Sequence, residues 1–267
     1  MELKSIAKEI RSLTLECVAS LGVGHIGGAL SITDLLAVLY YGEMNIDPGN
    51  PDMENRDRLV VSKGHAGPAV YAALAHKGYF PKEELLTLNK LGTKLPSHCD
   101  MNLTTGIDMT TGSLGQGFSC AVGMAVGSKI KKDGAYIFTV IGDGESQEGQ
   151  VWEAAMLANQ RNLDNLIAFT DSNKLQIDGT TDEVNSLSNL AGRWTSFGWN
   201  TQEIDGHDID EIISAIKNAK TTKGKPNMII MNTVKGRGVS FIEAAKAGNH
   251  SMNLSQDDLV RALGELV

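Results

Sequence analysis

Two apolar segments that end in polar residues most constrain how this chain can fold. Residues 136–144 end in Gly-Asp-Gly, and residues 165–173 end in Asp-Ser-Asn. The stretch between them, residues 145–162, has the pattern of a helix. Crossovers of this strand–helix–strand kind are almost always right-handed and join parallel strands, so the carboxyl ends of both strands lie at one edge of the sheet.

The polar residues at these strand ends predict a metal–diphosphate site. Open α/β sheets bind ligands at the carboxyl ends of their strands, where Asp143 and Asn173 would meet. Both side chains offer oxygen atoms, which suit Mg²⁺ or Ca²⁺, and Mg²⁺ usually takes one or two carboxylates plus the phosphates of a cofactor. Gly142 and Gly144 would let a diphosphate approach the backbone closely. An ordinary turn aspartate is the alternative reading of Gly-Asp-Gly.

Strands and helices alternate along the rest of the chain. This alternation predicts an α/β fold with a parallel sheet and helices on both faces. No repeat or linker divides the sequence, so we expect a single domain over residues 1–267. Further strands are expected at residues 58–62, 199–204 and 227–232, and helices at 3–21, 31–44, up to 77, 82–90, 112–131, 187–197, 208–219 and 255–266.

Composition and motifs exclude several classes of protein. A net charge of −8 without a basic stripe argues against nucleic-acid binding. The glycines at 142–149 do not match a dinucleotide-binding loop, and there is no P-loop sequence. No apolar run reaches the ~18 residues of a membrane span. Three cysteines without a Cys-x-x-Cys pair, and no signal peptide, fit a reducing cytoplasm.

Taken in order, six segments of the chain resemble transketolases. The resemblance covers essentially the whole chain but only the family's first domain. It implies the N-terminal, thiamine diphosphate-binding subunit of a split transketolase, which moves a two-carbon ketol unit from a ketose (phosphate) to an aldose. The second, pyrimidine-binding half would be a separate C-terminal subunit, and the assembly a dimer of heterodimers. The segments are residues 20–28, 62–66, 110–117, 142–149, 173–179 and 233–239.

The resemblance also implies how the cofactor is held. Asp143, Asn173 and the backbone carbonyl of Leu175 match the family's metal ligands for Mg²⁺, with Ca²⁺ as a substitute. The backbone amide of Gly144 matches the group that meets the diphosphate. A glutamate that links two cofactor sites across the subunit interface corresponds to Glu148, although a helix-surface glutamate is its alternative reading. The segment against which the thiazolium packs corresponds to Gly112, Leu114 and Gly115.

Four of the six histidines lie in the matching motifs. By resemblance, His65 touches the diphosphate. The histidines that would line the sugar channel and handle the oxygens of donor and acceptor, with the last also near the cofactor, are His25, His98 and His250. Histidine suits this work because its ordinary pKa lies near the operating pH. The other two, His76 and His207, match no motif and are predicted to be structural.

Three departures from the family pattern border the sugar channel. The usual Gly-His-Pro around the third histidine is Ser97-His98-Cys99 here, and residues 248–251 read Gly-Asn-His-Ser where split subunits commonly have Trp-His-Gly. Ile26 follows the first histidine where full-length members have proline. These changes put the usual pentose phosphates in doubt and make a specialised ketose, branched or carrying a sulfonate, a second possibility.

Two other functions stay open at this point. One is a different thiamine enzyme, either a 2-oxoacid decarboxylating subunit or a deoxyxylulose-phosphate synthase. The histidine set and the run of residues 144–153 favour transketolase over both. The other is a non-catalytic thiamine diphosphate-binding partner protein, which would have no need of Asp143, Asn173 and the histidines.

Overall fold

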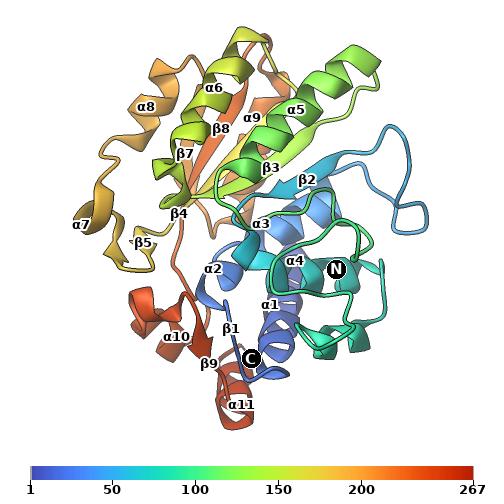
Figure 1. Cartoon of the computed structure of the whole chain (residues 1–267), viewed down its shortest axis with the longest axis vertical. Helices are drawn as coiled ribbons and strands as arrows, with labels where there is room; N and C mark the ends of the chain where they lie inside the picture. The colour runs from blue at the N-terminus through green and yellow to red at the C-terminus, as the bar shows by residue number, and fades with distance from the viewer. Residues whose placement is uncertain (1, 267) are drawn as a thin grey trace.

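A five-stranded parallel sheet forms the centre of the molecule, which is a computed structural model that describes residues 2–266 (Figure 1). The strand order is β2-β3-β4-β8-β7, and every neighbouring pair is parallel. The predicted α/β fold with a parallel sheet is therefore confirmed. The strands are β2 (Arg58–Val61), β3 (Ile137–Gly142), β4 (Leu166–Ser172), β8 (Asn227–Asn232) and β7 (Asn200–Asp205).

Helices cover both faces of this sheet, because successive strand residues point to opposite sides. Phe138 and Val140 of β3 join one core cluster, whereas Ile137 and Ile141 join the other. The second cluster lies under α5 (Gln116–Lys131), α6 (Gly149–Gln160) and α8 (Leu190–Ser196). The first lies under α1 (Leu3–Ala19), α3 (Thr33–Val38), α4 (Gly67–Lys77) and α9 (Ile209–Thr221), with α11 (Gln256–Glu265) against α1.

Three predicted helices are interrupted. The helix predicted at 31–44 is α3 followed by a π-helical turn (Leu39–Glu43), with the short α2 (Gly27–Leu30) just before it. The helix predicted at 112–131 begins only at Gln116, because Gly115 has φ +82°, which a helix cannot contain. The helix predicted at 145–162 is a 3₁₀ turn followed by α6. These interruptions free loops to line the site.

Short elements that the sequence did not predict bring distant segments together. β1 (Val23–Gly24) pairs antiparallel with β9 (Met252–Asn253), and β5 (Leu175–Gln176) forms a small hairpin with β6 (Gly179–Thr180). The first pairing joins segments more than 220 positions apart. The helix predicted at 82–90 is the 3₁₀ segment Lys82–Thr87. The remaining short helices are α7 (Thr181–Asn185), α10 (Ser240–Ala244) and the 3₁₀ segments Gly64–Ala66, Glu145–Gln147 and Lys246–Asn249.

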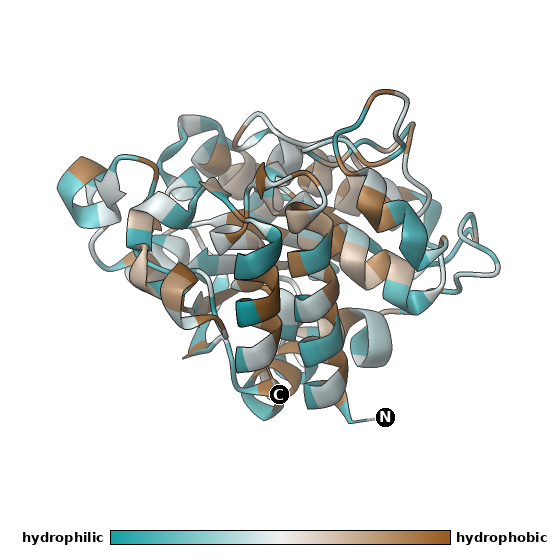
Figure 2. Cartoon of the chain, turned by 90° about the horizontal axis from the view of Figure 1, so that it is seen from below, coloured by the Kyte–Doolittle hydropathy of each residue, from teal (hydrophilic) through white to brown (hydrophobic). Residues whose placement is uncertain are grey.

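The helices on the outside of the molecule have mixed polarity. Seen from below, they carry hydrophobic residues alongside hydrophilic ones (Figure 2). Ser255 and Asp258 form a reciprocal capping box at the start of the last helix. Between residues 2 and 266 no helix combines the length and apolar character required to cross a bilayer.

Candidate functional site

The ends of β3 and β4 meet at one edge of the sheet, as the crossover predicts. Asp143 follows β3, and its backbone amide donates to the carbonyl of Asp171 at 3.2 Å. One carboxylate oxygen of Asp143 accepts from the Lys174 amide at 2.5 Å, and the other accepts from the Gly144 amide at 2.8 Å. The Asp143 carboxylate is thus held against the turn that carries Asn173.

Asn173 and Leu175 lie in the turn after β4. The Asn173 side-chain nitrogen donates to Asp171 Oδ2 at 3.1 Å, which leaves its oxygen Oδ1 to accept from the Leu175 amide at 3.1 Å. The Leu175 carbonyl accepts from Lys235 Nζ at 3.3 Å. Three oxygens of the kind that Mg²⁺ prefers therefore come from two neighbouring strand ends.

The charge of Asp143 fits a cation at this position. Its side chain is buried, and burial together with the nearby Asp171 carboxylate raises its pKa to about 6. Two buried carboxylates at one strand edge are stabilised when a divalent cation neutralises them. The residues present therefore fit a metal ion bound by oxygen.

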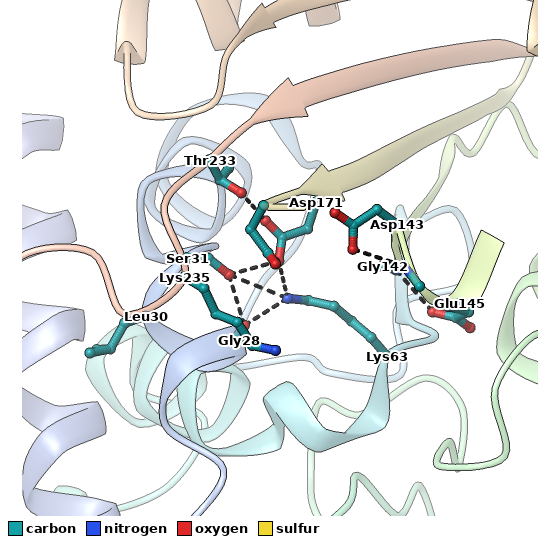
Figure 3. Close-up of polar contacts among 12 residues, drawn as sticks. Gly28, Leu30, Ser31, Lys63, Gly142, Asp143, Glu145, Asp171, Thr233 and Lys235 are labelled. Atoms are coloured by element: carbon teal, nitrogen blue, oxygen red, sulfur yellow. Dashed lines mark hydrogen bonds and ion pairs between the residues drawn. The ribbon is translucent and has the colours of Figure 1, made fainter. Parts of the chain in front are cut away.

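A buried ion pair that sequence reasoning missed lies beneath these ligands (Figure 3). Lys63 Nζ is 2.5 Å from Asp171 Oδ2 and 2.7 Å from the Gly28 carbonyl, and both side chains are essentially inaccessible to solvent. Asp171 also accepts from Ser31 at 2.7 Å and from the hydroxyl of Thr233. Burial alone would raise the pKa of Asp171, but Lys63 and these donors lower it. Two sequence signals could have indicated this ion pair: a lysine directly after one predicted strand and an aspartate inside another.

Four histidine rings converge beside this edge. The centre of the His25 ring lies 5.8 Å from that of His65, 5.3 Å from His98 and 5.2 Å from His250. The rings of His65 and His250 are 4.7 Å apart. The pairing of β1 with β9 explains part of the cluster, because His25 directly follows one strand and His250 lies two residues before the other.

Proximity and burial keep these histidines neutral. Burial and Lys235 lower the pKa of His250 to about 4, and burial and Lys63 hold that of His65 well below its usual value. Burial lowers the pKa of His98 as well, and burial and His98 lower that of His25. At neutral pH each ring can therefore accept one hydrogen bond or proton and donate another.

These shifts predict the acid side of the pH–rate profile. Because the folded-state pKa values lie below the ordinary histidine value, the neutral rings persist as the pH falls through about 6.5. We expect kcat/KM at about pH 6 to stay within about twofold of its value at about pH 7.5. The measurement is a pH series of the activity that the sequence analysis leads us to expect. A half-loss centred on pH 6.5 would contradict the prediction.

Lys235 is a second buried cation that the sequence analysis did not single out. Its Nζ lies 3.4 Å from His250 Nδ1, and burial together with Lys63 lowers its pKa to about 8. The loop that carries it is held by His207, whose Nε2 accepts from the Val234 amide at 2.9 Å while Nδ1 contacts Asp34. Lys63 and Lys235 place two positive charges in the same group of loops, which suits a ligand with several negative charges.

The two histidines predicted to be structural lie outside the cluster. His207 forms the loop contact just described. His76 lies between Tyr41, whose hydroxyl is 2.5 Å from Nδ1, and Glu9, which is 2.8 Å from Nε2. In each of these two histidines both ring nitrogens have a hydrogen-bonding partner, as expected of residues that stabilise packing.

The glycine-rich loop at 112–115 lies against the histidine-bearing turns. A Cβ atom on Gly64 would come within 2.7 Å of the Gly112 amide nitrogen, and one on Gly112 within 3.4 Å of the His98 ring. Gly112 has φ +152° and Gly115 φ +82°, which strains any other residue. Leu114 between them is half-buried. The loop thus forms a wall beside His98.

Glu148 is the one predicted site residue that this structure leaves apart. It is exposed at the start of α6 and makes no side-chain cap contact. An exposed carboxylate is what a contact with another subunit requires.

The altered loop at 248–251 has a packing role. Asn249 is fully buried and donates to the carbonyls of Lys235 at 3.0 Å and Ile242 at 2.8 Å. A Cβ atom on Gly27 would come within 2.0 Å of its side-chain oxygen, so only glycine fits there. Asn249 therefore fixes the segments that carry His250 and Lys235.

Comparison with known proteins decides the family. Residues 3–265 match the family profile described as transketolase, thiamine diphosphate binding domain. The chain belongs to the transketolase family. Its glycine-rich loops, histidine cluster and strand-end oxygens lie within the matched transketolase domain.

Two relatives of similar length are named as transketolase subunits. The chain is 59% identical to the 6-deoxy-6-sulfo-D-fructose transketolase subunit SqwG of Clostridium sp. (strain MSTE9), covering 100% of this chain and 96% of that protein. It is 39% identical to an apulose-4-phosphate transketolase subunit of Phocaeicola vulgatus, covering 100% and 95%.

A solved transketolase shares the same fold but is much longer. The transketolase of Leishmania mexicana superposes with a TM-score of 0.93 at 30% identity, and the match covers 100% of this chain but only 41% of that one. This chain therefore corresponds to the thiamine diphosphate-binding part of a full-length transketolase.

Proposed function

We propose that this chain is the thiamine diphosphate- and Mg²⁺-binding subunit of a split transketolase. It would act with a separate C-terminal subunit that supplies the pyrimidine-binding half, as a dimer of heterodimers. The observation that carries the proposal is the set of four neutral histidines beside the Asp143–Asn173 strand ends. The exposed carboxylate of Glu148 supports a site that is completed across a subunit interface.

The cofactor site draws on the strand-end oxygens and the lysine loop. Asp143, Asn173 and the Leu175 carbonyl would hold the metal, and Gly144, His65 and Lys235 the diphosphate. Gly112, Leu114 and Gly115 would pack on the thiazolium. When bound, thiamine diphosphate supplies a carbanion that adds to the carbonyl of a ketose and holds a two-carbon fragment.

The chain's own residues would bind sugars and move protons. His25, His98 and His250 are close enough to one another to contact neighbouring oxygens of a single sugar. A neutral ring can take the hydroxyl proton as the C2–C3 bond breaks and return it to the aldehyde oxygen of the acceptor.

Two observations support a class of ketose donor: the names of the relatives, and the departures of this sequence from the family pattern around the histidines. SqwG, the relative at 59% identity, acts on a ketose with a sulfonate tail, and the apulose relatives act on another specialised sugar phosphate. We propose 6-deoxy-6-sulfofructose as donor and an aldose phosphate as acceptor, rather than the standard pentose phosphates. We also propose a reducing, cytoplasmic setting, with which the free thiols of Cys17, Cys99 and Cys120 are compatible.

A coupled ketol-transfer assay tests this function. The chain is assayed alone and together with a C-terminal transketolase subunit, with thiamine diphosphate and Mg²⁺. Donors are 6-deoxy-6-sulfofructose, apulose 4-phosphate and xylulose 5-phosphate, and pyruvate is included to detect carbon dioxide release. We expect transfer only in the mixture and fastest from the sulfonated donor.

Other outcomes separate the parts of the proposal. Transfer by the chain alone would contradict the split enzyme. Preference for xylulose 5-phosphate would contradict the donor class but keep the reaction. Carbon dioxide release from pyruvate without transfer would replace the reaction with that of another thiamine enzyme.

A further inference from the structure

A second buried carboxylate near the site has no role in the chemistry described so far. Glu145 lies in the 3₁₀ turn after β3 and is 3% exposed. No lysine, arginine or histidine within the described residues forms an ion pair with it. A buried charge that lacks an ionic partner is costly unless hydrogen bonds compensate it.

Three donors from separate segments compensate this charge. Oε1 of Glu145 accepts from the Gly115 amide at 2.8 Å and from the hydroxyl of Ser62. Oε2 accepts from the Gly142 amide at 3.0 Å, as Figure 3 shows. The Ser62 oxygen in turn accepts from the Phe118 amide at 2.9 Å, so its own proton must go to Glu145. Burial raises the pKa of Glu145, and these three donors oppose that effect.

The donors belong to the two walls of the proposed cofactor site. Gly142 directly precedes the metal ligand Asp143, whereas Gly115 ends the loop assigned to the thiazolium. The same loop is held from outside, where Gln150 donates to the Leu114 carbonyl at 2.8 Å. The carboxylate also lies at the N-terminal end of α5, where the helix dipole favours a negative charge.

We propose that Glu145 is a positioning residue that fixes the thiazolium loop relative to the metal-binding turn. It does this by accepting hydrogen bonds from both backbone segments at once, and it does not touch the cofactor itself. The inference rests on the proposed function, because its consequence is the alignment of thiazolium and diphosphate. A glutamine cannot accept from all three donors, since its amide would direct an N–H against a backbone N–H.

Hydrogen exchange and cofactor dependence of Glu145→Gln test the proposal. In the purified chain without cofactor, we expect the amides of Gly115 and Gly142 to exchange about tenfold faster or more than in the wild type. In the two-chain enzyme, we expect the thiamine diphosphate concentration for half-maximal activity to rise about 10–100-fold. The exchange measurement needs no activity, so it judges this inference even if the proposed reaction is wrong.

Asp57 offers a matched control at the opposite edge of the sheet. It is also buried and accepts from two backbone amides, those of Asn45 and Tyr136, each at 2.8 Å. Asp57→Asn should lower stability but leave the exchange at Gly115 and the cofactor requirement within about twofold of wild type. An equal rise in cofactor requirement in Asp57→Asn would show a purely structural effect and overturn the proposal.

A milder variant covers the case in which Glu145→Gln does not fold. Ser62→Ala removes one donor and leaves the charge and both backbone contacts. We expect faster exchange at Gly115 and a smaller rise in the cofactor requirement. Unchanged exchange at Gly115 in either variant would overturn the proposal.

Discussion

Asp143→Asn is expected to abolish ketol transfer by the assembled enzyme while leaving the chain folded. The substitution keeps the shape of the side chain but removes the only carboxylate among the proposed metal ligands. A metal ion that neutralises phosphate and orients a cofactor is worth several kcal/mol, so activity should fall on the order of a thousandfold. The measurement is kcat at saturating donor over a Mg²⁺ titration.

Without metal, two opposing changes set the stability of the same variant. The folded-state pKa of Asp143 is raised to about 6 from its ordinary value of 3.8, so its ionisation weakens the metal-free fold as the pH rises through about 6. Asparagine removes that cost, but its amide directs an N–H against one of the two backbone amides that donate to Asp143, so the unfolding free energy near neutral pH should change by no more than about 2 kcal/mol. Urea unfolding without Mg²⁺ measures it.

Asp205→Asn is the control for this experiment. Asp205 ends β7 at the same edge of the sheet but is exposed, and its side chain accepts from the His207 amide at 2.8 Å. Its variant should retain activity and Mg²⁺ dependence. Full activity in Asp143→Asn would remove the metal site from this position.

Lys63→Met is expected to cause the largest loss of stability. It leaves the Asp171 carboxylate buried beneath the proposed metal ligands without the cation that now pairs with it. Removing one partner of a buried ion pair typically costs about 3–5 kcal/mol. Urea unfolding should show a lower midpoint with an unchanged slope.

The double variant Lys63→Met/Asp171→Asn separates charge from packing. A neutral amide in place of the carboxylate removes the buried charge, so the double variant should lose less stability than Lys63→Met alone. Ser31 and Thr233 donate to different oxygens of Asp171, so the remaining oxygen keeps one of these hydrogen bonds, and the other hydroxyl can accept from the new amide N–H. If Lys63→Met were as stable as wild type, Asp171 would have to be neutralised by some other means.

Much of the fold could be predicted from periodicity. The five strands of the sheet were expected within one or two residues of where they lie, because buried parallel strands are continuous apolar runs bounded by polar turns. Helix starts were less predictable. Helix α5 begins at Gln116, four residues later than predicted, because Gly115 just before it has a left-handed conformation. Glu145 and Gln150 stabilise this loop through hydrogen bonds to Gly115 and Leu114.

Pairings between distant residues could not be read from the chain. Lys63 and Asp171 are 108 positions apart, and Ser62 and Glu145 are 83 apart. A lysine after one strand and an acid in another are each unremarkable until the sheet order makes β2, β3 and β4 neighbours. The place of Lys235 in the site likewise becomes evident only from its distance to His250 in the structure.

The sequence by itself determined the family and the alternation of strands and helices, and it led to the proposed oxygen ligands Asp143 and Asn173. These features are local, because each depends on residue types at short spacing. Only the tertiary structure decided which charges are buried together and which histidines share one cluster. Burial and distance set those energies, and both arise when separate strands and loops meet at one edge of the sheet.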